Sequence, residues 1–250
     1  MKQVLVKNLI IGDGTPKICV PIVATTKDQL ISQLPSYKHK DIDMLEWRGD
    51  YLKEATSPTA MIELAKEIRS ILPDIPLLFT FRTKQEGGEQ ELSVSDYFHL
   101  NYALAQSGLV DFIDLELLIT SDKDAFLMQV SNLKKTGVKL IFSNHDFYET
   151  PSKDHIISTL LKMQDYGADI AKIALMPQTP QDVLTLLSAT YETSLCSNIP
   201  IVTMSMGKLG CISRVSGACF GSAITFSSLT EASAPGQIPV ADLKHMLQML

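Results

Sequence analysis

Short apolar segments alternate with longer amphipathic stretches along most of the chain. The apolar segments are rich in Ile, Val, Leu, Phe or Thr and have the length of buried strands. They are "KICVPIV", "IDMLEWR", "IPLLFTFR", "VDFIDLEL", "GVKLIFSNH", "ADIAKIALMP", "IPIVTMSM" and "SAITFSS". Because strands that alternate with helices pair side by side in parallel, the pattern predicts an α/β fold.

The amphipathic stretches carry helix start and stop signals. Ser57-Pro58 opens the stretch 57–72, and Gly108 closes the stretch 93–108. The stretch 120–137 opens on Thr120 or Ser121 and closes on Gly137. The stretches 150–167 and 179–195 have start and stop signals of the same kind. Each stretch is therefore predicted to form a helix between two strands.

Eight such strands within 250 residues are the usual content of a (β/α)₈ barrel. The segment "QVLVKNLIIG" before the first strand is expected to form a β-hairpin that plugs one end of the barrel. No linker divides the chain, so residues 1–250 are expected to form a single domain. An open doubly wound sheet is the alternative, but no Gly-rich phosphate fingerprint follows the first strand.

Composition narrows the class of protein. The formal net charge of −6 argues against a nucleic-acid or anionic-membrane partner, although clustered arginines could still bind a small anion. No apolar run approaches the ~18 residues of a membrane span, and Lys7 interrupts the apolar N-terminal segment, which does not resemble a secretory signal. The four cysteines form no CxxC pair, which favours reduced thiols in a cytoplasmic protein and predicts no metal site.

Polar residues follow the predicted strands. In a (β/α)₈ barrel the catalytic side chains lie at the carboxyl ends of the strands and in the loops that follow them. At those positions the sequence has Glu46 and Arg48, Arg82 and Glu86, His145, Lys172, Arg214, and finally Ser233 and Gln237. We therefore expect these side chains to converge on one site.

Lys172 is the most informative of these residues, because it interrupts the apolar segment "GADIAKIALMP". Residues two apart on a strand share a face, so Lys172 is expected to point into the barrel with Ile170 and Ala174. In a mostly apolar cavity its pKa would fall, and a neutral amine can form a Schiff base with a carbonyl. The alternative is a lysine whose stem packs on apolar surface while its ammonium reaches water.

The other polar residues suit acid–base chemistry and anion binding. His145 can carry protons near neutral pH, and Glu86 could orient it or could be a solvated loop carboxylate. Arg48, Arg82 and Arg214 offer bidentate donors to a carboxylate, although Glu46 with Arg48 could equally be a structural ion pair. Met204 and Met206 are expected to be apolar walls.

Eight segments in order identify the chain as similar to the type I 3-dehydroquinate dehydratases, which convert 3-dehydroquinate to 3-dehydroshikimate. They are "VKNLIIGDGTPKICV", "LEWRGDYL", "IPLLFTFRTKQEGGEQ", "GLVDFIDLEL", "SNHDFYETP", "GADIAKIALMPQ", "VTMSMGKLGCISRVSG" and "SAPGQI". The resemblance runs almost from end to end. It implies a (β/α)₈ barrel that is usually dimeric and uses no metal or cofactor.

The resemblance also implies roles for the residues. Lys172 would form an imine with the substrate ketone, His145 would act as the acid and base, and Glu86 would position His145. The carboxylate and hydroxyls of the substrate would be held by Arg214, Ser233, Gln237, Glu46, Arg48 and Arg82, and the apolar side of the site would be lined by Met204, Met206 and Phe226.

The sequence departs from the family pattern at three positions. Gly49 follows "EWR", where a bulky aliphatic residue is common, Ala171 precedes the lysine, where proline is frequent, and Pro21 replaces a serine of some members. None of these departures removes a reactive group.

Two other functions are compatible with the residues alone. One is another Schiff-base barrel enzyme, such as a class I aldolase that acts on a sugar phosphate with a phosphate site after the last two strands. The other is an inactive barrel that senses a small acid. The presence of both Lys172 and His145 counts against a sensor.

Overall fold

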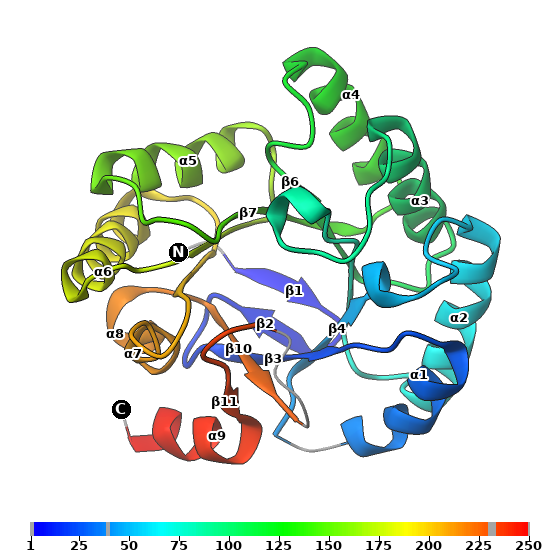
Figure 1. The fold of residues 1–250 in the computed structure, drawn as a ribbon, viewed down its shortest axis with the longest axis horizontal. Coiled ribbons are helices and arrows are strands. Elements are labelled where there is room, and N and C mark those ends of the chain that lie inside the picture. Colours follow the sequence, from blue (N-terminus) through cyan, green and yellow to red (C-terminus); the bar gives the residue numbers. More distant parts are fainter. Residues whose placement is uncertain (1–2, 39–40, 230–233, 250) are drawn as a thin grey trace.

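The computed structural model describes residues 3–38, 41–229 and 234–249. Its centre is a barrel of eight parallel strands, in the order in which they follow one another along the chain (Figure 1). The strands are β3 (Lys17–Ile22), β4 (Met44–Arg48), β5 (Leu77–Thr80), β6 (Phe112–Glu116), β7 (Lys139–Asp146), β8 (Ile170–Leu175), β9 (Ile201–Ser205) and β10 (Ile224–Ser228). All eight strands that the sequence predicts are confirmed.

The barrel closes between its last and first strands. β10 pairs in parallel with β3, and Ile201 at the start of β9 forms a parallel bridge with Ser222 just before β10. A short strand, β11 (Ile238–Pro239), pairs with the carboxyl end of β10. The open doubly wound sheet is therefore excluded.

A ring of helices surrounds the strands (Figure 1). The helices are α1 (Lys27–Gln33), α2 (Pro58–Ile71), α3 (Val94–Gln106), α4 (Lys123–Lys134), α5 (Lys153–Asp165), α6 (Pro180–Cys196), α7 (Ile212–Val215), α8 (Gly217–Phe220) and α9 (Val240–Met249). Short 3₁₀ turns are η1 (Leu34–Tyr37), η2 (Gly49–Tyr51) and η3 (Lys84–Glu86). The five helices that the sequence predicts are present.

Local capping explains where these helices begin. The Ser57 hydroxyl accepts a hydrogen bond from the backbone N–H of Ala60, and Thr179 forms a capping box with Asp182 at the start of α6. The expected start of α4 at Thr120 or Ser121 is wrong, because the carboxylate of Asp122 caps that helix through the N–H of Ala125.

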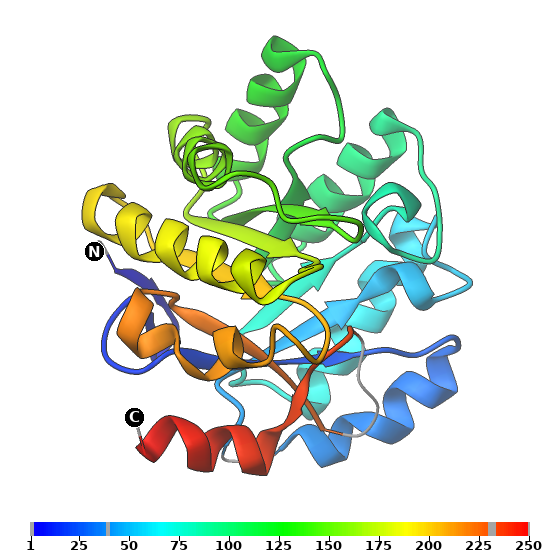
Figure 2. The ribbon, with the colours of Figure 1, turned by 60° about the vertical axis from the view of Figure 1, so that its left-hand side comes forward.

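The N-terminal hairpin consists of β1 (Val4–Val6) and β2 (Leu9–Ile11), which pair antiparallel. Val4 and Ile11 are buried in the same apolar cluster as Met44 and Ile170, which lie at the amino ends of the barrel strands. In Figure 1 the hairpin lies across the centre of the barrel, and in Figure 2 it lies at the left end. It therefore plugs the amino end, as the sequence predicts.

Side-chain alternation along the strands separates two cores. Outward-facing residues such as Trp47, Phe79 and Phe142 pack against the helices in the larger apolar cluster. Inward-facing residues are apolar at the amino ends of the strands, as with Phe112, and become polar two residues later, as with Asp114. Alternate residues of a strand share a face, so this gradient directs polar groups to the carboxyl end of the barrel.

The described part of the chain contains no helix that is both long enough and apolar enough to cross a membrane.

Candidate active site

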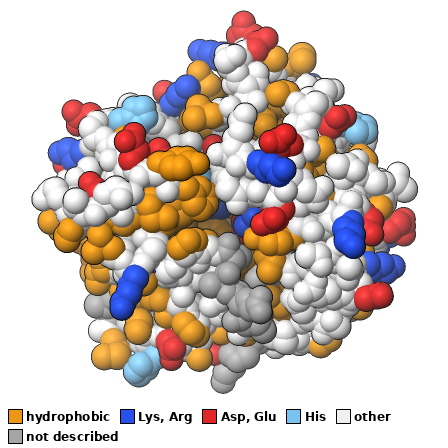
Figure 3. Space-filling view, in the orientation of Figure 1, with side chains coloured by type: hydrophobic (Ala, Val, Ile, Leu, Met, Phe, Trp, Pro, Cys, Tyr) orange, Lys and Arg blue, Asp and Glu red, His pale blue; other side chains and the backbone are white. Residues whose placement is uncertain are grey.

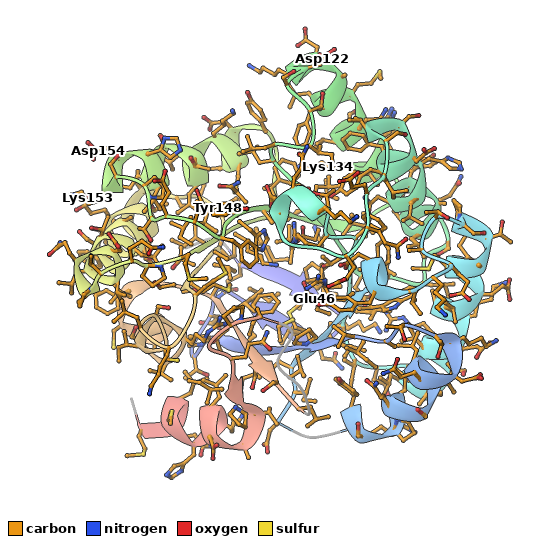
Figure 4. The ribbon with its side chains drawn as sticks, viewed as in Figure 1. Glu46, Asp122, Lys134, Tyr148, Lys153 and Asp154 are labelled. Carbon is orange, nitrogen blue, oxygen red and sulfur yellow. The ribbon has the colours of Figure 1, made fainter. Side chains whose placement is uncertain are left out.

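A cavity of about 250 Å³ opens at the carboxyl ends of the strands. It lies in the hollow at the centre of the face in Figure 3, and Figure 4 shows Glu46 inside the ring of strands while Lys153 and Asp154 lie on the outer helices. The predicted site residues in its lining are Glu46, Arg48, Arg82, Glu86, His145, Lys172, Met204, Met206, Arg214, Phe226 and Gln237. Ser233, which was also predicted, lies outside the described residues.

Lys172 lies in the middle of β8 and is only 4% exposed. Its Nζ is 3.2 Å from Oδ2 of Asp114, 3.7 Å from Oε1 of Glu46 and 4.5 Å from the centre of the Phe226 ring. The prediction that the amine points into the barrel is confirmed, and the alternative of an amine in open water is excluded. The prediction of mostly apolar surroundings is wrong at the amine itself, because the carboxylates of Asp114 and Glu46 flank it.

Asp114 is fully buried and joins Lys172 to a larger polar network. Its Oδ1 accepts hydrogen bonds from Arg82 Nη2 at 2.8 Å and from Ser143 Oγ at 2.6 Å. Burial alone would raise the pKa of Asp114, but the cations of Arg82 and Lys172 hold it below its usual range. The side chain is therefore an ionised carboxylate at neutral pH.

His145, near the end of β7, is paired with Glu86 of η3. The His145 Nδ1 and Glu86 Oε2 atoms are 2.9 Å apart, and the His145 backbone N–H donates to the same oxygen. The Asn144 amide donates to Oε1 of Glu86. These contacts hold the imidazole ring in place through Nδ1. The other ring nitrogen, Nε2, remains available to a substrate.

The two members of this pair have pKa values shifted in opposite directions. Burial raises the pKa of Glu86 to about 8, against the opposing effect of Arg82. Burial, together with the cations of Arg82, Lys172 and Arg48, lowers the pKa of His145 well below 6.5. A neutral imidazole at neutral pH is the form that can accept a proton.

Two of the arginines in the lining have carboxylate partners. Arg48 donates from Nε and Nη2 to the two oxygens of the fully buried Asp50, each at 2.8 Å. Arg82 forms ion pairs with Asp114, Glu116 and Glu86. The ion-pair partner of Arg48 is therefore Asp50 and not Glu46, which the sequence had suggested as an alternative.

Arg214, on the short helix α7, has different surroundings. Its guanidinium donates to the carbonyl oxygens of Phe226 at 3.4 Å and Pro235 at 3.0 Å. In the described part of the chain its Nε has no hydrogen-bond partner. Within the described residues, no carboxylate forms an ion pair with it. Burial lowers its pKa to about 10, which still leaves it charged at neutral pH. A buried cation without a counter-ion is suited to an anionic ligand.

Met204 and Met206 of the β9 segment, with Phe226 of β10, make the apolar wall of the cavity. The four cysteines Cys19, Cys196, Cys211 and Cys219 are unbridged. Across residues 3–38, 41–229 and 234–249, no group of three or more His, Cys, Asp or Glu side chains is positioned to hold a metal ion.

Asp114 is a residue of the site that was not among the candidates predicted from the sequence. The signal was present in the pattern "VDFIDLEL", because Asp114 shares the inward face of β6 with Phe112 and Glu116. A carboxylate on the inner face of a barrel strand requires a cation nearby, and Lys172 is one candidate that the sequence offered.

A barrel with a buried lysine, a paired histidine and an unpaired arginine around one cavity has the features of a Schiff-base enzyme that acts on a small carboxylic acid. The model of the family described as type I 3-dehydroquinase matches residues 18–250. The 3-dehydroquinate dehydratase of Salmonella typhimurium is 49% identical over 251 residues, covering 100% of this chain and 99% of the relative. The chain therefore belongs to the type I 3-dehydroquinase family.

Solved structures agree with this assignment. The type I 3-dehydroquinate dehydratase of Clostridium difficile has a TM-score of 0.95 and 44% identity, covering 99% of this chain and 97% of that one. The 3-dehydroquinate dehydratase of Geobacillus kaustophilus has a TM-score of 0.95 and 37% identity, with coverages of 100% and 96%. Family membership confirms the resemblance found in the sequence and decides against a sugar-phosphate aldolase.

Proposed function

We propose that this chain removes water from 3-dehydroquinate to give 3-dehydroshikimate, with Lys172 as the nucleophile and His145 as the acid and base. Family membership supplies the overall reaction, a hydro-lyase step of the shikimate pathway. The observation that carries the residue assignment is the single cavity in which a buried lysine, a histidine and an unpaired arginine meet. The related Clostridium difficile structure, which is described with covalently modified comenic acid, supports covalent chemistry in such a pocket.

The reaction begins with imine formation. The ammonium of Lys172 first gives up a proton, and the lone pair of the neutral amine attacks the ketone carbon. Two of the three ammonium protons end on the ketone oxygen, which leaves as water. The product is a protonated imine, so the nitrogen is cationic before and after the complete step. The protonated imine withdraws electrons from the neighbouring carbon and makes its C–H bond more acidic. This activation is the reason for covalent catalysis by an amine.

His145 then serves twice. Its Nε2 takes the proton from the carbon next to the imine, and the electron pair of that C–H bond forms an enamine. The enamine expels the hydroxyl group one carbon further on, and the protonated His145 donates a proton so that it leaves as water. Water then hydrolyses the imine and frees Lys172. Glu86 holds the imidazole ring in position through Nδ1.

The remaining residues bind and orient the substrate. Arg214 pairs with the substrate carboxylate, because it is the buried cation of the cavity that has no carboxylate partner among residues 3–38, 41–229 and 234–249. Gln237 and Ser233 assist Arg214, while Glu46, Arg48 and Arg82 face the substrate hydroxyls. Met204, Met206 and Phe226 cover the apolar side of the ring. Orientation of this kind places the reactive carbon between Lys172 and His145.

Borohydride reduction in the presence of 3-dehydroquinate tests the assignment. We expect a stable adduct on Lys172, located by mass spectrometry of peptides, and no adduct in Lys172→Met. Methionine is preferred to alanine because it fills most of the volume of the buried lysine stem. An adduct on another lysine, or none on a folded wild-type protein with substrate bound, would refute the assignment.

The variant His145→Ala separates the role of Lys172 in imine formation from the role of His145 in proton transfer. We expect this variant to lose turnover, because no base remains to remove the proton from carbon. We expect it still to form the reducible imine, because Lys172 forms that bond. Turnover at the wild-type rate would contradict the role of His145. Circular dichroism of each variant checks that the barrel remains folded.

We also propose a homodimer that works in the cytoplasm. The exposed side chains Leu184, Tyr191 and Leu195 lie at helical spacing on one stripe of α6. Figure 3 shows apolar side chains gathered over this helix on the left of the molecule. An exposed apolar patch of this kind is suited to a second copy of the chain. The free cysteines are compatible with a reducing compartment.

A further inference from the structure

Asp114 touches the nitrogen that reacts, yet it is not part of the cavity lining. Its Oδ2 lies 3.2 Å from Lys172 Nζ, and its side chain is fully buried. Asp114 therefore lies behind the amine, outside the lining of the cavity. A substrate can contact Lys172 without displacing this carboxylate.

The network around Asp114 keeps the carboxylate in one place. Arg82 Nη2 and Ser143 Oγ both donate to Oδ1, which leaves Oδ2 directed at Lys172. The Tyr97 hydroxyl donates to the backbone carbonyl of Asp114 at 3.3 Å and accepts from the N–H of Glu116 at 3.0 Å. Hydrogen bonds therefore hold both the backbone carbonyl and Oδ1 of Asp114, and Oδ2 is the oxygen that faces the amine of Lys172.

The other groups around the amine do not provide an equivalent charge. Glu46 is further from Nζ, at 3.7 Å, and its Oε1 also accepts a hydrogen bond from the Thr80 hydroxyl at 2.9 Å. The thiol of Cys19 is neutral, because burial raises its pKa well above 9. The Phe226 ring contributes its negative face at 4.5 Å. His145 and Arg82 act on the same region, and Arg82 already has three carboxylate partners.

We propose that Asp114 is the fixed counter-ion of the protonated imine on Lys172, a role that rests on the proposed function above. The nitrogen is cationic as the ammonium and again as the imine, so one buried carboxylate stabilises both states without moving. Loss of the imine proton would give a neutral imine, which is a weaker electron sink. Asp114 opposes that loss and so extends activity toward alkaline pH.

The distances favour Asp114 over Glu46 for this role. Coulomb attraction falls with separation and with the dielectric constant around the charges, and Asp114 is both nearer and more deeply buried. The low pKa of Asp114 agrees, because the acid form would carry no charge to offer.

The experiment measures kcat against pH for the wild-type protein, Asp114→Asn and Asp111→Asn. Asparagine keeps the shape and removes the charge. The alkaline limb is the part of the kcat–pH profile in which activity falls as the pH rises. We expect this limb to move to lower pH by about one unit in Asp114→Asn, because an opposite charge within ~4–6 Å shifts a pKa by about that much or more. Borohydride trapping of the imine on Lys172 is expected to weaken over the same pH range.

Asp111→Asn is the matched control. Asp111 also pairs with cations, Arg69 and Lys7, and it precedes the same strand β6, but it lies at the opposite end of the barrel. This variant also loses a carboxylate from an ion-pair cluster, so its stability is expected to fall. Its alkaline limb is expected to match the wild-type limb, because Asp111 is remote from Lys172.

Glu46→Gln keeps the proposal testable if Asp114→Asn does not fold. We expect its alkaline limb to stay close to the wild-type limb, whatever happens to KM. A shift of about one unit in Glu46→Gln would assign the counter-ion to Glu46 and overturn the proposal. An unshifted limb in a folded Asp114→Asn would overturn it as well. Failure of wild-type trapping on Lys172 would instead count against the proposed function itself.

Discussion

At the scale of single residues, two arginines of the same cavity have opposite surroundings. Arg82 has three carboxylate partners, whereas Arg214 has backbone carbonyls and an Nε with no partner among the residues that the structure describes. Removal of one member of a buried ion pair costs about 3–5 kcal/mol, because the remaining charge is left uncompensated. No such cost applies to a cation that lacks a carboxylate partner.

This contrast predicts different consequences for matched substitutions. Arg82→Met is expected to lower the free energy of unfolding by about 3–5 kcal/mol. Arg214→Met is expected to raise KM by about 10–100-fold, since a hydrogen bond to a charged group contributes ~1.5–3 kcal/mol, with a smaller loss of stability. Urea denaturation and steady-state kinetics check both expectations. An Arg214→Met enzyme with the wild-type KM would remove Arg214 from the substrate carboxylate.

Gly49 departs from the family pattern for a reason that the sequence alone could not supply. A Cβ added at this position would lie 2.5 Å from Cε2 of Phe79 and 2.9 Å from Cε of Met61. Both neighbours are buried side chains of the core outside the barrel. Phe79 and Met61 therefore occupy the space that a side chain at position 49 would need.

A compensating pair of substitutions tests this explanation. Gly49→Val is expected to destabilise the protein by about 1–3 kcal/mol through overpacking. Phe79→Leu in the same chain shortens the obstructing side chain, so the double variant should lose less stability than the sum of the two single variants. Thermal or urea unfolding of the four proteins measures the coupling. Simple additivity would show that the Phe79 ring does not limit position 49.

Some site residues could be predicted from the sequence, whereas their partners in space could not. Lys172, His145 and Glu86 could be found because each follows or interrupts a recognisable strand. The carboxylate neighbours of Lys172 could not be assigned, since the pairing of residues from β4, β6 and β8 depends on strand register and side-chain reach. Asp50, which orients Arg48, was missed because it lies in a 3₁₀ turn with no periodic pattern.

At the scale of elements, the strands were the most predictable part of the chain. Most of their residues are buried on both faces, so each strand stands out as a short segment rich in apolar residues even where a polar residue such as Asp114 or Lys172 interrupts it. The helices α1 and α9 were not predicted. α1 has seven residues, which is too short for a clear apolar period, and Leu30 is its buried residue. α7 and α8 have four residues each and depend on tertiary contacts.

The stripe on α6 leads to a prediction about assembly. Leu184→Asp is expected to weaken or abolish the proposed dimer, because it puts a charge into an apolar contact. Met128→Asp on α4 is the matched control, since Leu184 and Met128 are 58% and 57% exposed. Sedimentation or light scattering measures the mass of each variant. A wild-type monomer, or equal effects of both substitutions, would remove α6 from the interface.

At the scale of the whole molecule, the barrel separates stability from chemistry along its axis. The amino end is closed by the hairpin and by an apolar layer that includes Phe112 and Ile170. The carboxyl end holds the charged groups, whose burial is costly and must be offset by their partners. The apolar layer therefore supplies stability beneath a polar site whose buried charges are costly.

This separation predicts that the plug can be weakened without loss of catalysis. Ile11 of β2 is fully buried against the inner apolar layer, and Ile11→Ala is expected to cost about 2–5 kcal/mol of unfolding free energy. The kcat and KM should stay near their wild-type values at temperatures where the variant is folded, because Ile11 is not among the residues that line the cavity. Leu5→Ala, on the exposed side of the same hairpin, is the control with little expected effect. Urea denaturation alongside steady-state kinetics decides the matter: a fall in kcat with unchanged stability would mean that the hairpin shapes the site rather than merely closing the barrel.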